Sequence, residues 1–294
     1  MGVTVKDVLV STPVVVDITE ELNRKFPLLG GFTIGNNSFV FAARKAKIPS
    51  DPIQHQYGQL FKVPISGGTM SESILVHLKH GNDIAYYNSN YYVAMGSRKE
   101  FNEEKQIAKF ASNLEYKNNF EFKSKSGTLN GLAPLDYISK ICHYSGTNFI
   151  AGNGLKLALC KLNEANRSFD EIGRFNLQDD KSVFYRPNYE DRAGQGIFYA
   201  NHKIYNIISY KLPNEEYRYN DIAVYSVSEI GDTLKTTLET VYKCDYNTVP
   251  GKGDMELFEI EGIAALNGTT FYIALNQRNA AGDPCDAIYH VYLT

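Results

Sequence analysis

Apolar residues along this chain fall in short runs that flank turn-forming residues, and the pattern recurs five times. Each copy has a small or polar residue, an apolar pair or triplet, a turn, and then an apolar run rich in aromatic residues. The copies span residues 31–43, 83–95, 140–152, 196–208 and 262–275. Two short apolar runs on either side of a tight turn are typical of a β-hairpin. We therefore predict five hairpins.

The turns within these copies support this prediction. They consist of residue types that tolerate the positive φ of two-residue hairpin turns, namely Gly35-Asn36-Asn37, Asn88-Ser89, Ser145-Gly146, Asn201-His202 and Asn267-Gly268. The first apolar residues of the copies are Phe32, Ile84, Ile141, Ile197 and Ile263, with separations of 52, 57, 56 and 66 residues. A repeat of this length accommodates a four-stranded propeller blade if the connecting loops are long.

Further apolar runs supply the remaining strands. They lie at 60–65 and 74–78, 157–162 and 172–177, and 222–227 and 237–242, whereas 106–123 is less regular. The fifth unit has one strand after its hairpin, at 287–293, and residues 3–11 and 13–18 near the N-terminus are candidates for the missing one. We predict a single all-β domain over 1–294. It is a five-bladed β-propeller with four-stranded antiparallel blades, in which the N-terminal strand closes the last blade. The alternative is a sandwich of unrelated hairpins.

The predicted topology places the long connections on one face of the propeller. These are 44–59, 96–113, 124–136, 178–195, 211–220, 246–258 and 278–286. Long connections in a compact fold are often functional. Polar residues that lead into the inner strands should ring the channel mouth on this face, and they are His80, Asn82, Asp83, Tyr137, Lys140, Arg192, Gln195, Glu259 and Glu261.

Three members of this ring are candidates for acid–base catalysis. A buried glutamate with a raised pKa and a histidine are suitable proton carriers, which selects Glu261, Glu259 and His80. We expect Glu261 to be the most critical residue for function. The predicted ligand-binding residues are Asn82, Asp83, Tyr137, Lys140, Arg192 and Gln195. Two alternatives stay open: the acidic and amide groups hold calcium, or the ring residues only satisfy one another's hydrogen bonds.

Composition limits the classes of molecule that the protein is expected to bind. Lys plus Arg number 30 and Asp plus Glu number 33, so the net charge of −3 gives no reason to expect nucleic-acid binding. The four cysteines are far apart in the sequence and predict unpaired thiols. Without a zinc-finger spacing or a phosphate-binding glycine loop, we expect no metal and no cofactor. No signal peptide or membrane span is predicted, so we expect a cytoplasmic protein or one released without a conventional signal.

The C-terminal segment carries a resemblance to a known family. Glu259-Ile260-Glu261-Gly262-Ile263, Phe271–Leu275, Ala280–Asp283 and Ile288–Tyr292 resemble the closing segment of the helveticin J family of large bacteriocins over about 35 residues. This resemblance implies an antimicrobial propeller. The function it favours is a bacteriocin-like recognition protein that binds a cell-surface or small-molecule ligand on the long-loop face. The alternative is a cofactor-free enzyme that performs acid–base chemistry on a small molecule at the channel mouth.

Overall fold

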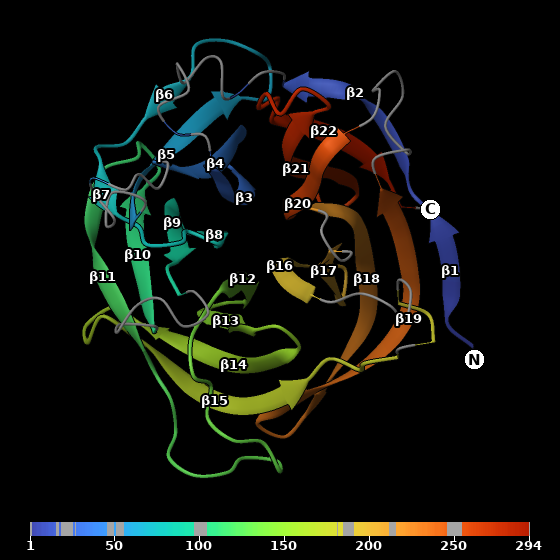
Figure 1. Ribbon diagram of the computed structural model, residues 1–294. Helices are drawn as coiled ribbons and strands as arrows, with labels where there is room; N and C mark the ends of the chain where they lie inside the picture. The colour runs from blue at the N-terminus through green and yellow to red at the C-terminus, as the bar shows by residue number, and fades with distance from the viewer. Residues whose placement is uncertain are drawn as a thin grey trace.

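A computed structural model of the chain shows an all-β architecture (Figure 1). The structure describes residues 2–15, 18, 26, 28–45, 50, 56–96, 105–180, 182–184, 191–211, 216–245 and 255–293. Four hydrogen-bonded sheets stand around a central axis, with five, eight, four and five strands. The described elements include no helix that is long and apolar enough to cross a membrane.

One five-stranded sheet contains β3 (Leu28–Gly35), β4 (Ser38–Arg44), β5 (Tyr57–Pro64), β6 (Ser71–Glu72) and β7 (Val76–His77). The eight-stranded sheet contains β8 (Asp83–Tyr87), β9 (Asn90–Ala94), β10 (Gln106–Ala111), β11 (Tyr116–Lys123), β12 (Lys140–Ser145), β13 (Asn148–Asn153), β14 (Lys156–Asn163) and β15 (Ser168–Asn176). The other two sheets contain β16 (Asp191–Ala200), β17 (Lys203–Lys211), β18 (Tyr217–Ile230), β19 (Thr233–Asp245) and β1 (Thr4–Asp7), and β20 (Met255–Leu266), β21 (Thr270–Asn279), β22 (Ala287–Tyr292) and β2 (Leu9–Val15).

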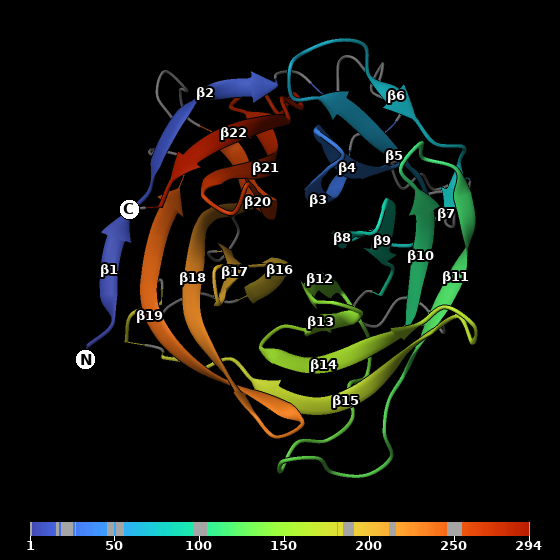
Figure 2. The same ribbon diagram turned by 180° about the vertical axis from the view of Figure 1, so that it is seen from behind.

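The five predicted hairpins are confirmed as the strand pairs β3–β4, β8–β9, β12–β13, β16–β17 and β20–β21. Their turns use the positive φ that the sequence predicts, for example 46° at Asn88 and 59° at Ser89. The first strand of each pair lies nearest the axis, and the turns are seen from behind in Figure 2. The shared apolar residues all lie on these innermost strands and are buried: Phe32, Ile84, Ile141, Ile197 and Ile263.

The two ends of the chain meet in one sheet. Strand β2 pairs antiparallel with β22, so the N-terminal segment completes the sheet that begins with β20, as predicted. Both termini lie on the same outer side of the molecule (Figure 1).

Three features differ from the predicted blades. Strand β1 adds to the outer edge of β19 in parallel, and β11 pairs in parallel with β15, which joins two groups of four strands into the eight-stranded sheet. The predicted strand at 74–78 is replaced by the two short strands β6 and β7, which pair separately with β5. Parallel contacts between segments distant in sequence leave no local pattern, which is why the repeat did not reveal them.

The loop at 124–136, predicted as part of a ligand face, is fixed by a buried ion pair. The Arg174 guanidinium donates to both carboxylate oxygens of Glu171, and its Nη1 donates to the carbonyl oxygen of Gly127 at an N–O distance of 2.6 Å. Glu171 in turn accepts the backbone N–H of Lys125. The predicted long connections 44–59, 96–113, 178–195, 211–220 and 246–258 each include residues outside the described ranges.

All four cysteines are free, and Cys142, Cys160 and Cys244 are buried whereas Cys285 is partly exposed. Burial raises the pKa of the Cys160 thiol above its usual range, which suppresses the reactive thiolate. We expect a thiol reagent to modify Cys285 first in the folded protein, and four thiols after denaturation without a reductant. A count of two in the denatured protein would reveal a disulfide and contradict the structure.

Candidate functional site

Two rings of residues form the candidate site, because the five inner strands enter the centre at equivalent positions. Four residues before the shared apolar position stand Leu28, His80, Tyr137, Ala193 and Glu259, and all five line one pocket. Two residues before it stand Gly30, Asn82, Ser139, Gln195 and Glu261, and the four that carry side chains line the same pocket. The first group forms an upper ring and the second forms the pocket floor.

Three of the inner strands carry a β-bulge at the level of the pocket floor. The register of β20 against β21 shifts between Ile260 and Gly262, so that Glu261 is the extra residue. Similar shifts occur in β16 between Gly194 and Ile197, and in β3 before Phe32. Glu259 and Glu261 are two positions apart on β20, and both line the same cavity.

Below the floor, the axis is closed by backbone contacts and one carboxylate. A Cβ on Gly262 would lie 2.7 Å from Cβ of Phe32, and one on Gly31 would lie 2.5 Å from Cα of Asp83. Asp83 accepts backbone N–H groups from Ile84, Ile141 and Ile197, each at 3.0 Å and each from a different inner strand. The structure therefore has a pocket with a closed floor.

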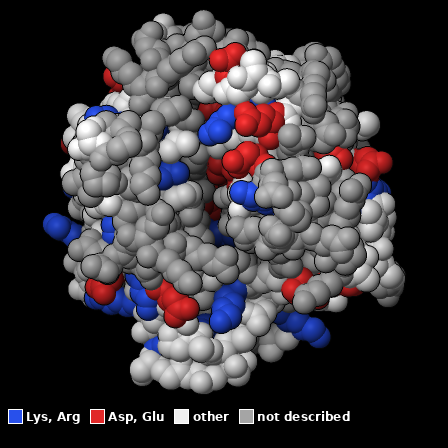
Figure 3. All heavy atoms as spheres, viewed as in Figure 1, with Lys and Arg blue, Asp and Glu red and all other residues white. Residues whose placement is uncertain are grey.

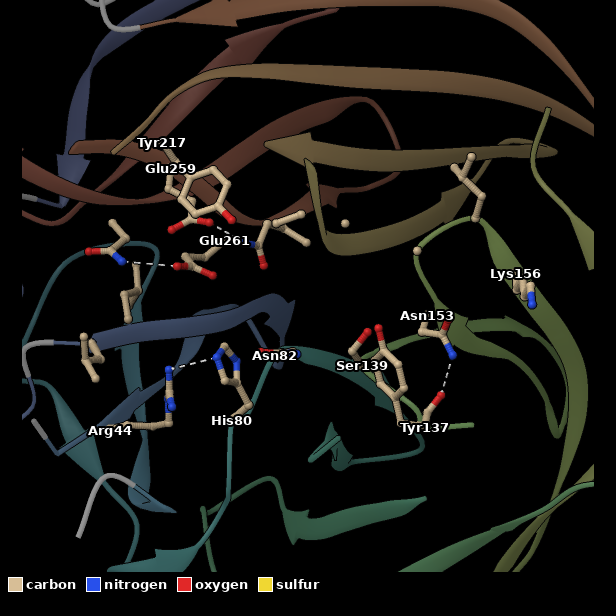
Figure 4. Close-up of a pocket in the computed structure, with 18 residues that line it drawn as sticks. Arg44, His80, Asn82, Tyr137, Ser139, Asn153, Lys156, Tyr217, Glu259 and Glu261 are labelled. Atoms are coloured by element: carbon tan, nitrogen blue, oxygen red, sulfur yellow. Dashed lines mark hydrogen bonds between the residues drawn. The ribbon is translucent and has the colours of Figure 1, made fainter. Parts of the chain in front are cut away.

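The pocket has a volume of about 720 Å³, which is the size of a small-molecule site. It opens as a hollow in the middle of the face in Figure 3, where acidic side chains gather on one wall. Figure 4 shows Glu259 and Glu261 near Tyr217 on that wall, with Arg44 and His80 facing them. Glu259 and Glu261 are the only acidic residues among the described residues that line the pocket.

The two glutamates are buried and electrostatically linked. Burial raises the pKa of Glu259 to about 7, against the donor Nε2 of Gln195 and the positive charge of Arg44. Burial also raises the pKa of Glu261 well above its ordinary value, and the negative charge of Glu259 adds to this increase. Asn276 Nδ2 donates to Glu261 Oε1 at 3.3 Å. With one proton on the pair, its single negative charge balances Arg44.

Arg44 and His80 form the facing wall. Arg44 Nη2 lies 3.3 Å from His80 Nε2. Because the guanidinium only donates, His80 accepts at Nε2, and we assign the proton of its neutral ring to Nδ1. Arg44 is only 7% exposed. Its charge therefore acts on the pocket with little screening by solvent.

The pocket brings together six of the nine predicted site residues: the catalytic candidates Glu261, Glu259 and His80, and the ligand-binding candidates Asn82, Tyr137 and Gln195. Asp83 and Lys140 do not line it, which corrects their prediction as ligand-binding residues. They are 1% and 0% exposed beneath the floor, where Lys140 Nζ donates to Asn206 Oδ1. Burial raises the pKa of Asp83, against three N–H donors and Lys140. The Arg192 side chain lies outside the described residues.

Six polar residues that line the pocket were missed by the sequence analysis: Arg44, Ser139, Asn153, Lys156, Tyr217 and Asn276. Two of them could have been found from hairpin register. Arg44 is the cross-strand partner of Leu28, and Asn276 is that of Glu259. In these two hairpins, the first polar residue after the apolar run of the second strand lies opposite the upper-ring residue of the first strand, and it lines the pocket.

Among the described residues, no three His, Cys, Asp or Glu side chains are grouped so that they could hold a metal ion. The calcium alternative therefore has two carboxylates and neighbouring amides at most. Arg44 and the raised pKa of both glutamates oppose binding of a cation there.

The raised pKa values make stability depend on pH. Between pH 4.5 and 7 the folded protein binds protons at Glu259 more tightly than the unfolded chain does, so rising pH reduces the free energy of unfolding by about 3 kcal/mol from this group. We expect Glu259→Gln to flatten this part of the stability profile and to be more stable than the parent at pH 8. Urea unfolding at several pH values measures both effects. Glu121→Gln, at an exposed position of β11, is the control, and an unchanged slope in Glu259→Gln would contradict the burial effect.

No protein-family model and no curated protein matches the chain. Among solved structures, the chain is similar to a xylan β-1,4-xylosidase from Bacillus halodurans C-125, with a TM-score of 0.51, 12% identity, and coverage of 92% of this chain and 54% of the other. It is also similar to the catalytic domain of the Coprinopsis cinerea GH62 α-L-arabinofuranosidase, with a TM-score of 0.50, 8% identity, and coverage of 97% and 96%. A bifunctional GH43-CE protein from Bacteroides eggerthii gives a TM-score of 0.50 and 10% identity, and the 98% of this chain that aligns spans 34% of that protein. At these identities the likeness shows the β-propeller fold alone.

These findings correct the function that the sequence favoured. The chain was predicted to be a bacteriocin-like recognition protein that binds a cell-surface or small-molecule ligand, but the structures it resembles are glycoside hydrolase enzymes. Its long-loop face is also hollowed into a pocket of small-molecule size rather than flat. The resemblance of the C-terminal segment to the helveticin J family stays a prediction that no comparison tests.

Proposed function

We propose that this protein is an enzyme that performs acid–base chemistry on a small carbohydrate in the pocket, and that the reaction is hydrolysis of a glycosidic bond. The observation that carries the proposal is the buried pair of Glu259 and Glu261, which lines a pocket opposite Arg44 and His80. Buried carboxyl groups with pKa values raised toward neutrality are suited to proton transfer.

The fold beneath the site is, in this proposal, a five-bladed propeller. Five inner strands enter the axis at equivalent positions, and the eight-stranded sheet divides into two antiparallel groups of four at the parallel β11–β15 contact. The pocket would then be the shared mouth of the five blades, and each inner strand supplies one residue to each ring.

The roles of the two glutamates follow from their protonation. Above about pH 7 the pair holds one proton, which we place on Glu261, and Glu259 is then a carboxylate. Glu261 donates its proton to the leaving oxygen as the C–O bond breaks. Water forms the new bond to the sugar carbon and gives its proton to Glu259. Proton exchange with solvent then returns Glu261 to its protonated form and Glu259 to its carboxylate form. Apart from water, both steps use only side chains of this chain.

The surrounding residues support these roles. Gln195 donates to Glu259 and holds its carboxylate toward the pocket, while Asn276 does the same for Glu261. Arg44 balances the remaining negative charge, so the pair keeps one proton instead of two. Three solved structures of the same fold, with TM-scores of 0.50 or 0.51, are named as a xylosidase, an arabinofuranosidase and a GH43 protein, which selects sugars as the first substrates to test.

The test is release of nitrophenolate from nitrophenyl β-D-xyloside and α-L-arabinofuranoside by the purified protein. We expect kcat/KM to rise with pH through about 7 as Glu259 ionises, and to fall at higher pH as Glu261 loses its proton. Failure to hydrolyse either glycoside or the matching xylo- and arabino-oligosaccharides would overturn the proposal of glycoside hydrolysis.

A further inference from the structure

Asn82 stands on the pocket floor with a fixed backbone. Its N–H donates to the carbonyl oxygen of Ala94 at 3.0 Å. The preceding residue, Gly81, has a φ of 58°, donates to the carbonyl oxygen of Leu78 and accepts the N–H of Gly31 at 2.7 Å. This short segment is therefore tied to β3 and to the end of β9 before any ligand arrives.

The side-chain amide of Asn82 is also fixed. Nδ2 donates to the carbonyl oxygen of Gly96 at 3.0 Å. The reverse orientation would set Oδ1 against that carbonyl oxygen, so this bond assigns the amide. Oδ1 then has no hydrogen-bond partner among the described residues, although Asn82 is only 9% exposed and lines the pocket. A buried acceptor without a partner costs free energy, which a ligand donor can recover.

Unlike Asn82, two other residues of the pocket floor have hydrogen-bond partners for their side chains. Gln195 donates to Glu259, and Glu261 accepts from Asn276, so both already have partners within the protein. In Figure 4, Asn82 lies between His80 and Ser139, across the floor from Glu261. A ring-shaped ligand that reaches across the floor from Glu261 would therefore meet Asn82.

We propose that Asn82 is a specificity-determining residue, and that its Oδ1 accepts a hydrogen bond from a hydroxyl group of a neutral sugar seated on the pocket floor. The inference rests on the proposed function for the choice of a sugar. An acceptor oxygen without a donor disfavours a carboxylate or phosphate at this point of the ligand, whereas a hydroxyl group supplies the missing donor.

The first test needs no activity. Crystals of the parent protein are soaked in several hundred millimolar D-xylose and, separately, L-arabinose. We expect a sugar hydroxyl within hydrogen-bond distance of Asn82 Oδ1. Absence of both sugars from the pocket, or a bound sugar whose hydroxyl groups avoid Oδ1, would overturn the inference even if the protein hydrolyses glycosides.

The second test measures selectivity. The monodeoxy sugar that lacks the contacting hydroxyl should bind the parent about tenfold more weakly than the full sugar in an NMR titration. Asn82→Leu, which is similar in size, should bind the two sugars equally. Asn118→Leu is the matched control, because Asn118 Oδ1 is also buried without a partner but does not line the pocket. Equal discrimination by the parent and Asn82→Leu would refute the role of Asn82. If discrimination is found without hydrolysis, the proposed function fails and the sugar site stands.

Discussion

Glu261→Gln is expected to lower kcat/KM for the best aryl glycoside by about 10²–10⁴-fold while the protein stays folded. Proton transfer by a positioned side chain contributes about that much to the rate, and the amide keeps the shape of the carboxyl group but cannot donate a proton to the leaving oxygen. Because Asn276 Nδ2 donates to Oε1 of Glu261, the amide oxygen of Gln can accept the same bond. The variant therefore separates chemistry from structure.

Glu259→Gln should cause a similar loss but leave a different signature. It removes the group whose pKa is raised to about 7, so the rise of kcat/KM through neutral pH should disappear. Aryl glycosides with good leaving groups should partly rescue Glu261→Gln, since they need less proton donation, but should not rescue Glu259→Gln. Full activity of Glu261→Gln at unchanged thermal stability would remove Glu261 from the site.

Asp83→Ala is expected to lower the free energy of unfolding by roughly 3–5 kcal/mol, measured by urea or thermal unfolding. The change leaves the buried N–H groups of Ile84, Ile141 and Ile197 without their acceptor and removes a negative charge near Lys140. Since these N–H groups belong to three inner strands, the loss weakens the closed axis under the pocket.

Asp136→Ala provides the comparison, because Asp136 is exposed in the segment that precedes β12. It should change stability by less than about 0.5 kcal/mol. Equal effects of the two substitutions would show that Asp83 does not tie the inner strands together.

Local chemistry explains why the hairpins could be predicted. A pair such as Asn88-Ser89 favours positive φ wherever it occurs, and the apolar runs beside it must be buried. The shared position of Phe32, Ile84, Ile141, Ile197 and Ile263 follows from the same pattern, which also locates the polar residues that precede it. Glu259, Glu261, His80 and Asn82 were therefore accessible from sequence.

Which residues line the pocket depends on shifts of a single position along the chain. Asn82 and Asp83 are adjacent, yet one lines the pocket and the other lies beneath its floor. Successive side chains of a strand point in opposite directions. Which of the two enters the pocket depends on how closely the five inner strands approach one another at the axis. The same is true of Ser139 and Lys140.

By itself, the sequence determined the all-β class, the five hairpins with their turns, the strand that each shared apolar residue occupies, and the N-terminal segment as a partner of the last sheet, because each depends on local propensity or on a periodic pattern. Tertiary structure alone decided the bulge at Glu261, the parallel β1–β19 and β11–β15 pairs, the pairing of Arg44 with His80 and the closure of the axis by Asp83. These features arise where segments distant in sequence come within a few ångströms of one another, and no local preference of the chain records that approach.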